Sequence, residues 1–256
     1  MSERQGSPDE EMVADYDVRS PASRTLLTVV GTILAVGIVV GLVLGASILK
    51  RSTTVSTSDI DLGDSALIKI DAGASNLRIV QGTSDVVRVK ARITSGLRKT
   101  DFQIGRRGDE IKIVSGCQEW LNPGCGAETT IEVPEGYPVE VRTTSGDVTV
   151  RDLVENALTV NSGTGDISGM GLEVDEFSAS TTSGDVTAAF AKQPFAFKAT
   201  TTSGDVAATM ASGKRTYAVT ATSKSGDVSS DIESDTDGAG FIRVTTDSGD
   251  IAVTSR

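Results

Sequence analysis

The chain has 256 residues, of which 38% are hydrophobic, 4% aromatic and 23% charged, and it contains no histidine and only two cysteines. Without histidine, Ser-His-Asp and Cys-His catalytic systems are excluded, and two cysteines cannot complete a tetrahedral zinc shell. A net charge of −11 argues against nucleic acid as a partner, because phosphate binding depends on clustered Lys and Arg.

The first 49 residues divide into a polar and an apolar part. Residues 1–25 carry six acidic and three basic side chains, which predicts a disordered acidic cytoplasmic tail. Residues 26–49 contain no charge and are long enough, at ~1.5 Å per residue, to cross a ~30 Å hydrocarbon core. A cleaved secretory signal is the alternative, but it has a shorter apolar stretch behind a short basic start. We therefore expect a single-pass transmembrane helix, followed by a linker at residues 50–59.

Three glycines lie four residues apart within the expected span: Gly37, Gly41 and Gly45. This spacing places them on one helix face, where a second helix could approach closely. The alternative is that glycine is simply frequent in membrane helices. The chain could therefore form homo-oligomers through this face.

The orientation in the membrane rests on the two cysteines, because positive charges flank both ends of the span about equally. Cys117 and Cys125 lie in a loop that also contains Trp120 and Pro123, and we interpret them as a disulfide closing a small ring. Two unpaired buried cysteines are the alternative. Since disulfides persist in oxidising compartments, the C-terminal part is expected outside the cell.

A short repeat organises the rest of the chain. A Ser/Thr-Gly-Asp turn followed by Val or Ile recurs with spacings of 19, 19, 20, 22 and 23 residues. The six copies are Ser145-Gly146-Asp147-Val148, Thr164-Gly165-Asp166-Ile167, Ser183-Gly184-Asp185-Val186, Ser203-Gly204-Asp205-Val206, Ser225-Gly226-Asp227-Val228 and Ser248-Gly249-Asp250-Ile251.

The residues before each turn alternate strictly. Positions six and four before the Ser or Thr are apolar in all copies, and positions five and three before it are polar, as in a strand with one buried face. Each repeat is thus strand, turn, strand, and must stack on neighbours to bury its apolar face. Parallel stacking gives a β-solenoid, whereas an antiparallel meander would use Ser-Gly as hairpin loops. Matching residues at matching positions favour the all-β solenoid, spanning residues 60–256.

Weaker copies of the frame extend upstream, and an open edge is expected downstream. Ile68 and Ile70 precede Ala74-Ser75-Asn76-Leu77 at the same offsets, and Phe102 and Ile104 precede Gly108-Asp109-Glu110-Ile111. We expect the free coil edge of the stack at Ile251 to Arg256, where strand pairing would remain available.

The repeated acidic residues form an expected column on one edge: Asp147, Asp166, Asp185, Asp205, Asp227 and Asp250. The simplest interpretation is that each accepts backbone N–H groups within its own turn. Adjacent carboxylates could instead hold Ca²⁺, although the glycine-rich nonapeptide of calcium-binding β-rolls is absent. An acid–base pair on a polysaccharide-cleaving β-helix is a further alternative. A residue required in every turn is better explained by folding, so no enzyme and no cofactor are expected.

The chain resembles the toastrack-type, adhesin-like domain family of bacterial cell-surface proteins. The resemblance covers residues 60–256 and is clearest from Val133-Pro134-Glu135-Gly136 through Val139 to Val148. It implies a β-helix-like scaffold behind an N-terminal membrane helix, and surface attachment or envelope-stress sensing. The segment from Cys117 to Cys125 departs from the family pattern.

Two functions are consistent with these observations. The first is a membrane-anchored extracellular binding module, adhesin-like, which contacts a glycan, the cell wall or a protein through its Thr/Ser-rich face or its free coil edge. The second is a sensor of envelope stress or cationic antimicrobial peptides, because residues 52–256 carry a net charge of −10. The cell membrane is the expected location in both.

Overall fold

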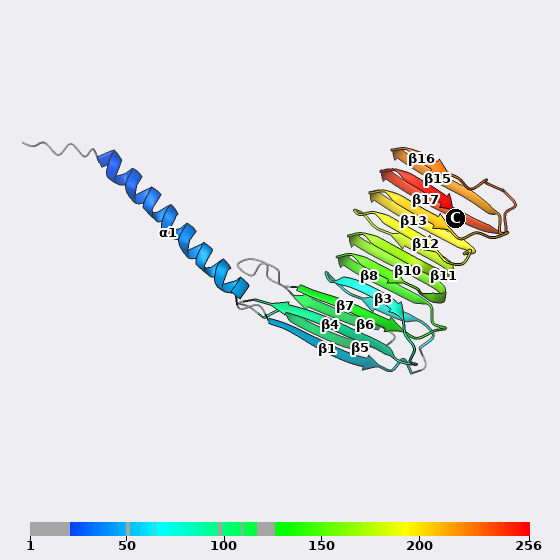
Figure 1. Ribbon diagram of the computed structural model, residues 1–256, viewed down its shortest axis with the longest axis horizontal. Helices are drawn as coiled ribbons and strands as arrows, with labels where there is room; N and C mark the ends of the chain where they lie inside the picture. The colour runs from blue at the N-terminus through cyan, green and yellow to red at the C-terminus, as the bar shows by residue number, and fades with distance from the viewer. Residues whose placement is uncertain (1–20, 50–51, 64, 97–98, 109, 117–125) are drawn as a thin grey trace, which may run out of the picture. The chain divides into compact units, whose positions relative to one another are not determined.

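The computed structural model describes residues 21–49, 52–63, 65–96, 99–108, 110–116 and 126–256. The chain divides into two compact units, Met1–Gly45 and Ala46–Arg256. One apolar helix lies near the N-terminus and strands make up the second unit, which confirms the all-β class with a preceding helix (Figure 1).

The helix α1 spans Pro21–Leu49 and therefore begins earlier than the expected residue 26. Proline is favoured in the first turn of a helix, because its fixed φ is helical and its missing N–H has no partner there anyway. Within α1, Val29–Ala46 is long and apolar enough to cross a membrane by length and composition. Residues 21–25 are thus helical rather than part of the tail, and residues 1–20 lie outside the described residues.

The described part of the second unit contains eighteen strands. In chain order they are β1 (Ser52–Ile60), β2 (Ile68–Asp71), β3 (Asn76–Gln81), β4 (Val87–Ser95), β5 (Asp101–Arg107), β6 (Glu110–Gly116), β7 (Gly126–Val133), β8 (Val139–Ser145), β9 (Val148–Arg151), β10 (Val154–Thr164), β11 (Ile167–Ser180), β12 (Val186–Phe190), β13 (Ala196–Ser203), β14 (Val206–Met210), β15 (Tyr217–Ser225), β16 (Val228–Ser230), β17 (Gly240–Ser248) and β18 (Ile251–Ser255).

Equivalent strands of successive repeats pair in parallel and in register. The strands before the Gly-Asp turns form one sheet in the order β8, β10, β11, β13, β17, β15. The strands after the turns form a second sheet in the order β9, β11, β12, β14, β18, β16. The long strand β11 contributes its first half to one sheet and its second half to the other. This is stacking of coils and not the antiparallel meander.

The apolar positions of the repeat form columns inside the stack. Val139 is aligned with Leu158, which is aligned with Phe177, and all three are buried. The ring of Phe197 lies 5.7 Å from that of Phe177 and 5.5 Å from that of Phe190, between centroids. Strands from both sheets therefore share one dry core, which no single coil could enclose.

The last two coils are stacked out of chain order. β17 pairs with β13 on one side and with β15 on the other, so the C-terminal coil β17–β18 lies between β13–β14 and β15–β16 (Figure 1). The expectation of a free edge at Ile251 to Arg256 is therefore wrong, because β15 and β16 form the end of the stack. Residues 211–216 connect β14 to β15 across the layer of β17 and β18, whereas residues 231–239 return from β16 to the adjacent coil. Both connections are longer than residues 191–195, which join β12 to β13 in adjacent coils.

The opposite end of the stack consists of antiparallel strands. β2 and β3 stack on β8 and β9, and β6 and β7 stack on β2 and β3. β4 then pairs antiparallel with β7, β1 with β4, and β5 with β6. The upstream copy at Phe102 and Ile104 is thus an antiparallel hairpin and not a coil, because the chain reverses directly at Gly108. The expected linker 50–59 contains most of β1.

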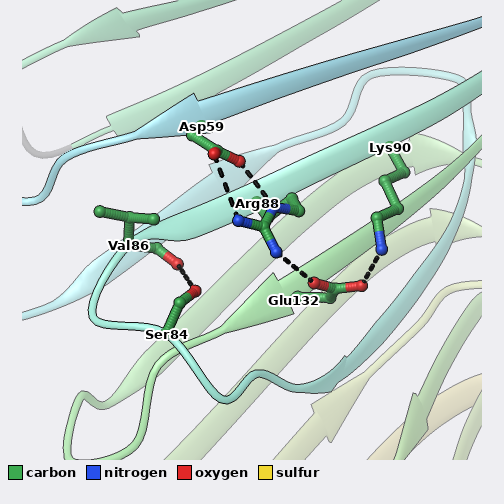
Figure 2. A network of polar contacts seen from close by, with 6 residues as sticks. All are labelled: Asp59, Ser84, Val86, Arg88, Lys90 and Glu132. Atoms are coloured by element: carbon green, nitrogen blue, oxygen red, sulfur yellow. Dashed lines mark hydrogen bonds and ion pairs between the residues drawn. The ribbon is translucent and has the colours of Figure 1, made fainter.

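An ion-pair network links the strands β1, β4 and β7 at this end (Figure 2). Arg88 on β4 pairs with Asp59 on β1, with 2.7 Å between Nε and Oδ1. It also pairs with Glu132 on β7, with 3.6 Å between Nη1 and Oε2. Lys90 also pairs with Glu132. The hydrogen bond from Arg88 holds the pKa of Asp59 below its usual value. Opposite charges directly across antiparallel strands favour this register over a slipped one.

Candidate binding site at the open end of the stack

The turn glycines are required by both backbone conformation and space. Gly184 has a φ of 139° and Gly204 of 148°, in the region that side chains rarely adopt. A Cβ on Gly204 would also lie within 3 Å of the carbonyl oxygen of Gly184 in the adjacent coil. The corner is therefore built for stacking as well as for turning.

The turn aspartates form an aligned ladder in which each carboxylate serves the next coil. Asp166 N–H donates to Asp147 Oδ1 at 3.0 Å, and Asp185 N–H donates to Asp166 Oδ1 at 2.9 Å. The ladder starts at Asn76, whose Oδ1 accepts from the Asp147 amide. The full order is Asn76, Asp147, Asp166, Asp185, Asp205, Asp250 and Asp227. The expectation that each aspartate bonds within its own turn is wrong, because the stacking brings the neighbouring amide into reach.

The hydrogen bonds of the ladder already use one oxygen of most of its carboxylates. The Oδ1 atom of each aspartate before the last already accepts an amide. In the described part of the chain, no group of three or more Asp, Glu, Cys or His is arranged to hold a metal ion.

A column of buried hydroxyls inside the same corner was missed by the sequence analysis. Two residues before each turn Ser or Thr, a hydroxyl faces inward, and most of these hydroxyls donate to a backbone carbonyl: Thr201 to Gly184 O, Ser223 to Gly249 O and Thr246 to Gly204 O. The repeated Ser or Thr at this offset is visible in the sequence, but a polar type alone suggests exposure. Thr246 is fully buried.

The stack ends at β15 and β16. β15 pairs with β17 and β16 with β18, and no other strand of the described chain pairs with their outer edges. Asp227 closes the ladder: its amide donates to Asp250 Oδ1, and no described amide donates to its own carboxylate. The acceptor that every other turn offers to the next coil is thus free here.

Part of this outer edge is covered by the chain itself. Ser234 Oγ accepts from the Val219 amide at 3.0 Å, and the Asp235 amide donates to Tyr217 O at 2.8 Å. These contacts protect the first half of β15, as natural edge strands commonly are. Among the residues that the structure describes, no comparable contacts cover the second half of β15 or the outer edge of β16.

The uncovered end is apolar at its centre and acidic around it. Val228 is 47% exposed, and Val219 and Ala221 are only partly buried. Between residues 217 and 237 there are five acidic side chains, namely Asp227, Asp231, Glu233, Asp235 and Asp237. Lys224, the one basic residue of this segment, lies 2.7 Å from Asp247, and Arg215 and Arg256 line a cavity with Asp231 and Glu233. The end therefore carries excess negative charge beside an exposed valine.

The remaining sequence candidates lie elsewhere. Cys117 and Cys125 fall outside the described residues, so their disulfide stays a prediction. A Cβ on Gly37, Gly41 or Gly45 would meet nothing within 4 Å, which leaves helix association untested. The Thr/Ser-rich face is the outer face of the first sheet, where Thr159, Ser178 and other polar residues lie partly exposed.

Comparison with known proteins gives a family and several distant structural likenesses. The model of the family described as Toastrack DUF4097 matches residues 65–189 and 135–254. Among curated proteins there is no match.

Three solved structures are similar to this chain at low sequence identity. A candidate cell adhesion protein from Clostridium sporogenes is 14% identical with a TM-score of 0.47, over 80% of this chain and 100% of that chain. A candidate adhesin from Bacteroides fragilis is 14% identical with a TM-score of 0.37, over 80% and 98%. A candidate lipid binding protein from Parabacteroides distasonis is 11% identical with a TM-score of 0.29, over 80% and 97%.

Proposed function

Since the chain belongs to the Toastrack DUF4097 family, we propose that residues 52–256 form an adhesin-like, non-enzymatic binding domain, anchored in the cell membrane by α1 and displayed outside the cell. Its ligand is an extended polypeptide segment with basic and apolar residues, which adds as a further strand to the open end of the stack.

The observation that carries this proposal is the unpaired parallel edge formed by β15 and β16, with an exposed valine and acidic side chains beside it. The opposite end of the stack finishes differently, in the antiparallel edge strands β1 and β5, and the Asp59–Arg88–Glu132 ion pairs link β1 to β4 and β7. At β15 and β16, no strand of the described chain pairs with the outer edges. An unpaired edge of this kind supplies main-chain hydrogen bonds to an incoming strand, and pockets for alternate side chains supply specificity.

The charge and apolar surface at the open end select the ligand. Five acidic residues between 217 and 237 favour a basic segment, and the exposed Val228 favours an apolar residue that packs against it. A catalytic role receives no such support, because the repeated aspartates are used in the corner ladder.

The proposal is tested with the full chain in detergent micelles and a short peptide of alternating Lys and Val. We expect saturable binding, which weakens with salt because the attraction is partly electrostatic. Val228→Lys should weaken binding by about tenfold or more, because it places a charge on the receiving edge. Val55→Lys is the matched control, since Val55 is 65% exposed on the antiparallel edge strand β1 at the opposite end of the stack.

A second peptide distinguishes strand addition from charge attraction alone. The same peptide with alternate backbone amides N-methylated keeps its charge but loses hydrogen-bond donors. Equal binding of both peptides, or equal loss of binding in Val228→Lys and Val55→Lys, would contradict the proposal.

A further inference from the structure

A small cavity lies at the corners opposite to the Gly-Asp turns. Its volume is about 150 Å³, and its walls come from the segments that join one coil to the next. The side chains that line it include Glu135, Val154, Glu155, Glu173, Asp175 and Lys192. The cavity is therefore strongly acidic. Its lining residues lie between 135 and 192 and thus precede the strands β15 and β16 of the open end.

Glu155 is the unusual member of this lining. Its side chain belongs to a residue only 6% exposed. Oε2 accepts from the Gly136 amide at 3.0 Å, whereas Oε1 is buried without a hydrogen-bond partner in the described chain. A buried carboxylate oxygen that lacks a partner is costly, so its presence calls for an explanation.

The corner uses one oxygen of this carboxylate, as acceptor of the Gly136 amide. In the parallel register of β10 and β11, Glu155 is aligned with Val174, which is completely buried. The adjacent coil thus fills the same column with an apolar side chain. The oxygen that serves the corner is Oε2, and the buried Oε1, which has no partner in the described chain, points to a ligand.

The charges around the cavity are unbalanced. Lys192 pairs with Asp175, with 3.1 Å between Nζ and Oδ1, which leaves Glu135 and Glu173 beside Glu155 with no ion pair in the described chain. Gln81 and the Tyr137 amide are the other polar groups near the Glu155 carboxylate. A bound cation would offset this repulsion.

We propose that this cavity binds a primary ammonium group carried on an alkyl chain, with the Glu155 carboxylate as its principal acceptor. The exposed side chain of Val154 offers an apolar wall for the alkyl part. The ion pair of Lys192 with Asp175 shows that the same wall already accommodates an alkylammonium group. A metal ion fits less well, since the described residues contain no group of three or more Asp, Glu, Cys or His arranged around one point.

Binding of such a cation is coupled to proton release from Glu155. Burial, opposed by the Gly136 and Tyr137 amides and reinforced by the charge of Glu135, raises the pKa of Glu155 to about 7. Only the ionised carboxylate attracts the ammonium group. Affinity should therefore rise about tenfold between pH 6 and pH 8 and then level off, following the ionised fraction of Glu155.

The test uses the full chain in detergent micelles, titrated calorimetrically with n-butylammonium chloride at pH 6, 7 and 8. n-Butanol is the uncharged control probe and calcium chloride the metal control. We expect butylammonium alone to bind, with the pH dependence above and with proton release in buffers of different ionisation enthalpy.

Two variants separate this site from general surface charge. Glu155→Gln, which keeps the shape of the side chain, should lose about tenfold or more in affinity and all of the pH dependence. Glu140→Gln is the matched control, because it removes a carboxylate that pairs with Arg142 on the outer face of β8. Binding of butanol or calcium as tight as that of butylammonium, pH-independent binding, or equal effects of the two variants would overturn the proposal. Val228→Lys should leave this binding unchanged, so failure here is distinct from failure at the open end.

Discussion

The aspartates of the corner ladder each perform two opposed roles. Each carboxylate before the last accepts an amide from the adjacent coil, which is favourable. Neighbouring carboxylates also repel one another, because parallel strands lie only ~4.8 Å apart. Asn76 at the start of the ladder shows that a neutral amide oxygen accepts the same bond.

Substitution of Asp185 should separate the two effects. Asp185→Ala removes the acceptor of the Asp205 amide and should lower the free energy of unfolding by ~1 kcal/mol, since water can reach this exposed corner. Asp185→Asn keeps the acceptor and removes repulsion, so it should be at least as stable as the wild type. Denaturant unfolding at low salt measures both. Asp227→Ala is the control, and a loss as large as that of Asp185→Ala would contradict the ladder.

Glu155 should make the stability of the ligand-free domain depend on pH. Its pKa is about 7 in the folded chain, against 4.5 for an ordinary glutamate. Between these values the unfolded chain ionises while the folded chain holds its proton, so stability should fall as pH rises from about 4.5 to about 7 and stay level above.

Thermal unfolding of the wild type and of Glu155→Gln at pH 5 and pH 8 measures this effect. The difference in Tm between the two pH values should be smaller in the variant, because a glutamine does not titrate. An unchanged difference would mean that Glu155 is already ionised at pH 5.

At the level of strands, the alternation around each turn was sufficient to predict the coils. Val139 and Val141 are buried while Glu140 between them is partly exposed, as the offsets indicate. The same frame correctly identified Ile68 and Ile70, which are aligned with Val139 and Val141 across β2 and β8. The alternation of apolar and polar residues and the residue types of the turns are local properties, so they can be identified from the sequence alone.

The order of the coils could not be predicted in this way. Ser203 is aligned with Ser248, although Ser225 follows it in the chain and has the same flanking residues. Near-identical repeats fit one another in any order, so the residue types do not distinguish them. The longer spacing of 22 residues between Asp205 and Asp227 was the available signal, because the extra residues let a connection cross a layer.

Neither the cavity at Glu155 nor the binding site at β15 and β16 could be predicted from the sequence, for physical reasons. Glu155 lies where β9 turns into β10, and the alternation of the repeat breaks between it and Leu158. The acidic residues at 231–237 were visible, but their place beside an open edge depends on the exchanged order of the last coils.

Cross-linking should report the exchanged order directly. Thr200 is aligned with Thr245 on β17, and Thr245 with Thr222 on β15. In a Cys117→Ser, Cys125→Ser background, the pair Thr200→Cys and Thr245→Cys should therefore form a disulfide on mild oxidation. The pair Thr200→Cys and Thr222→Cys, separated by a whole strand, should not. The reverse result would place the coils in chain order and remove the open end at β15.

At the scale of the whole chain, adhesion and sensing make different demands on the N-terminal residues. A domain that binds outside the cell needs only an anchor, and α1 begins at Pro21. A sensor must also pass its signal to the other side of the membrane, for which residues 1–20 are the available segment. We expect the strands of residues 52–256 to fold without this acidic segment.

Deletion of residues 1–20 therefore distinguishes the two functions while leaving α1 whole. We expect intact cells that express the shortened chain to bind the alternating Lys and Val peptide as strongly as cells with the full chain. Protease added to intact cells should remove the domain at 52–256 from both, which checks display and orientation in the same experiment. Normal display with lost binding would show that the N-terminal segment takes part in recognition. A domain that resists external protease in both strains would place it on the inner side of the membrane, where an adhesin could not act.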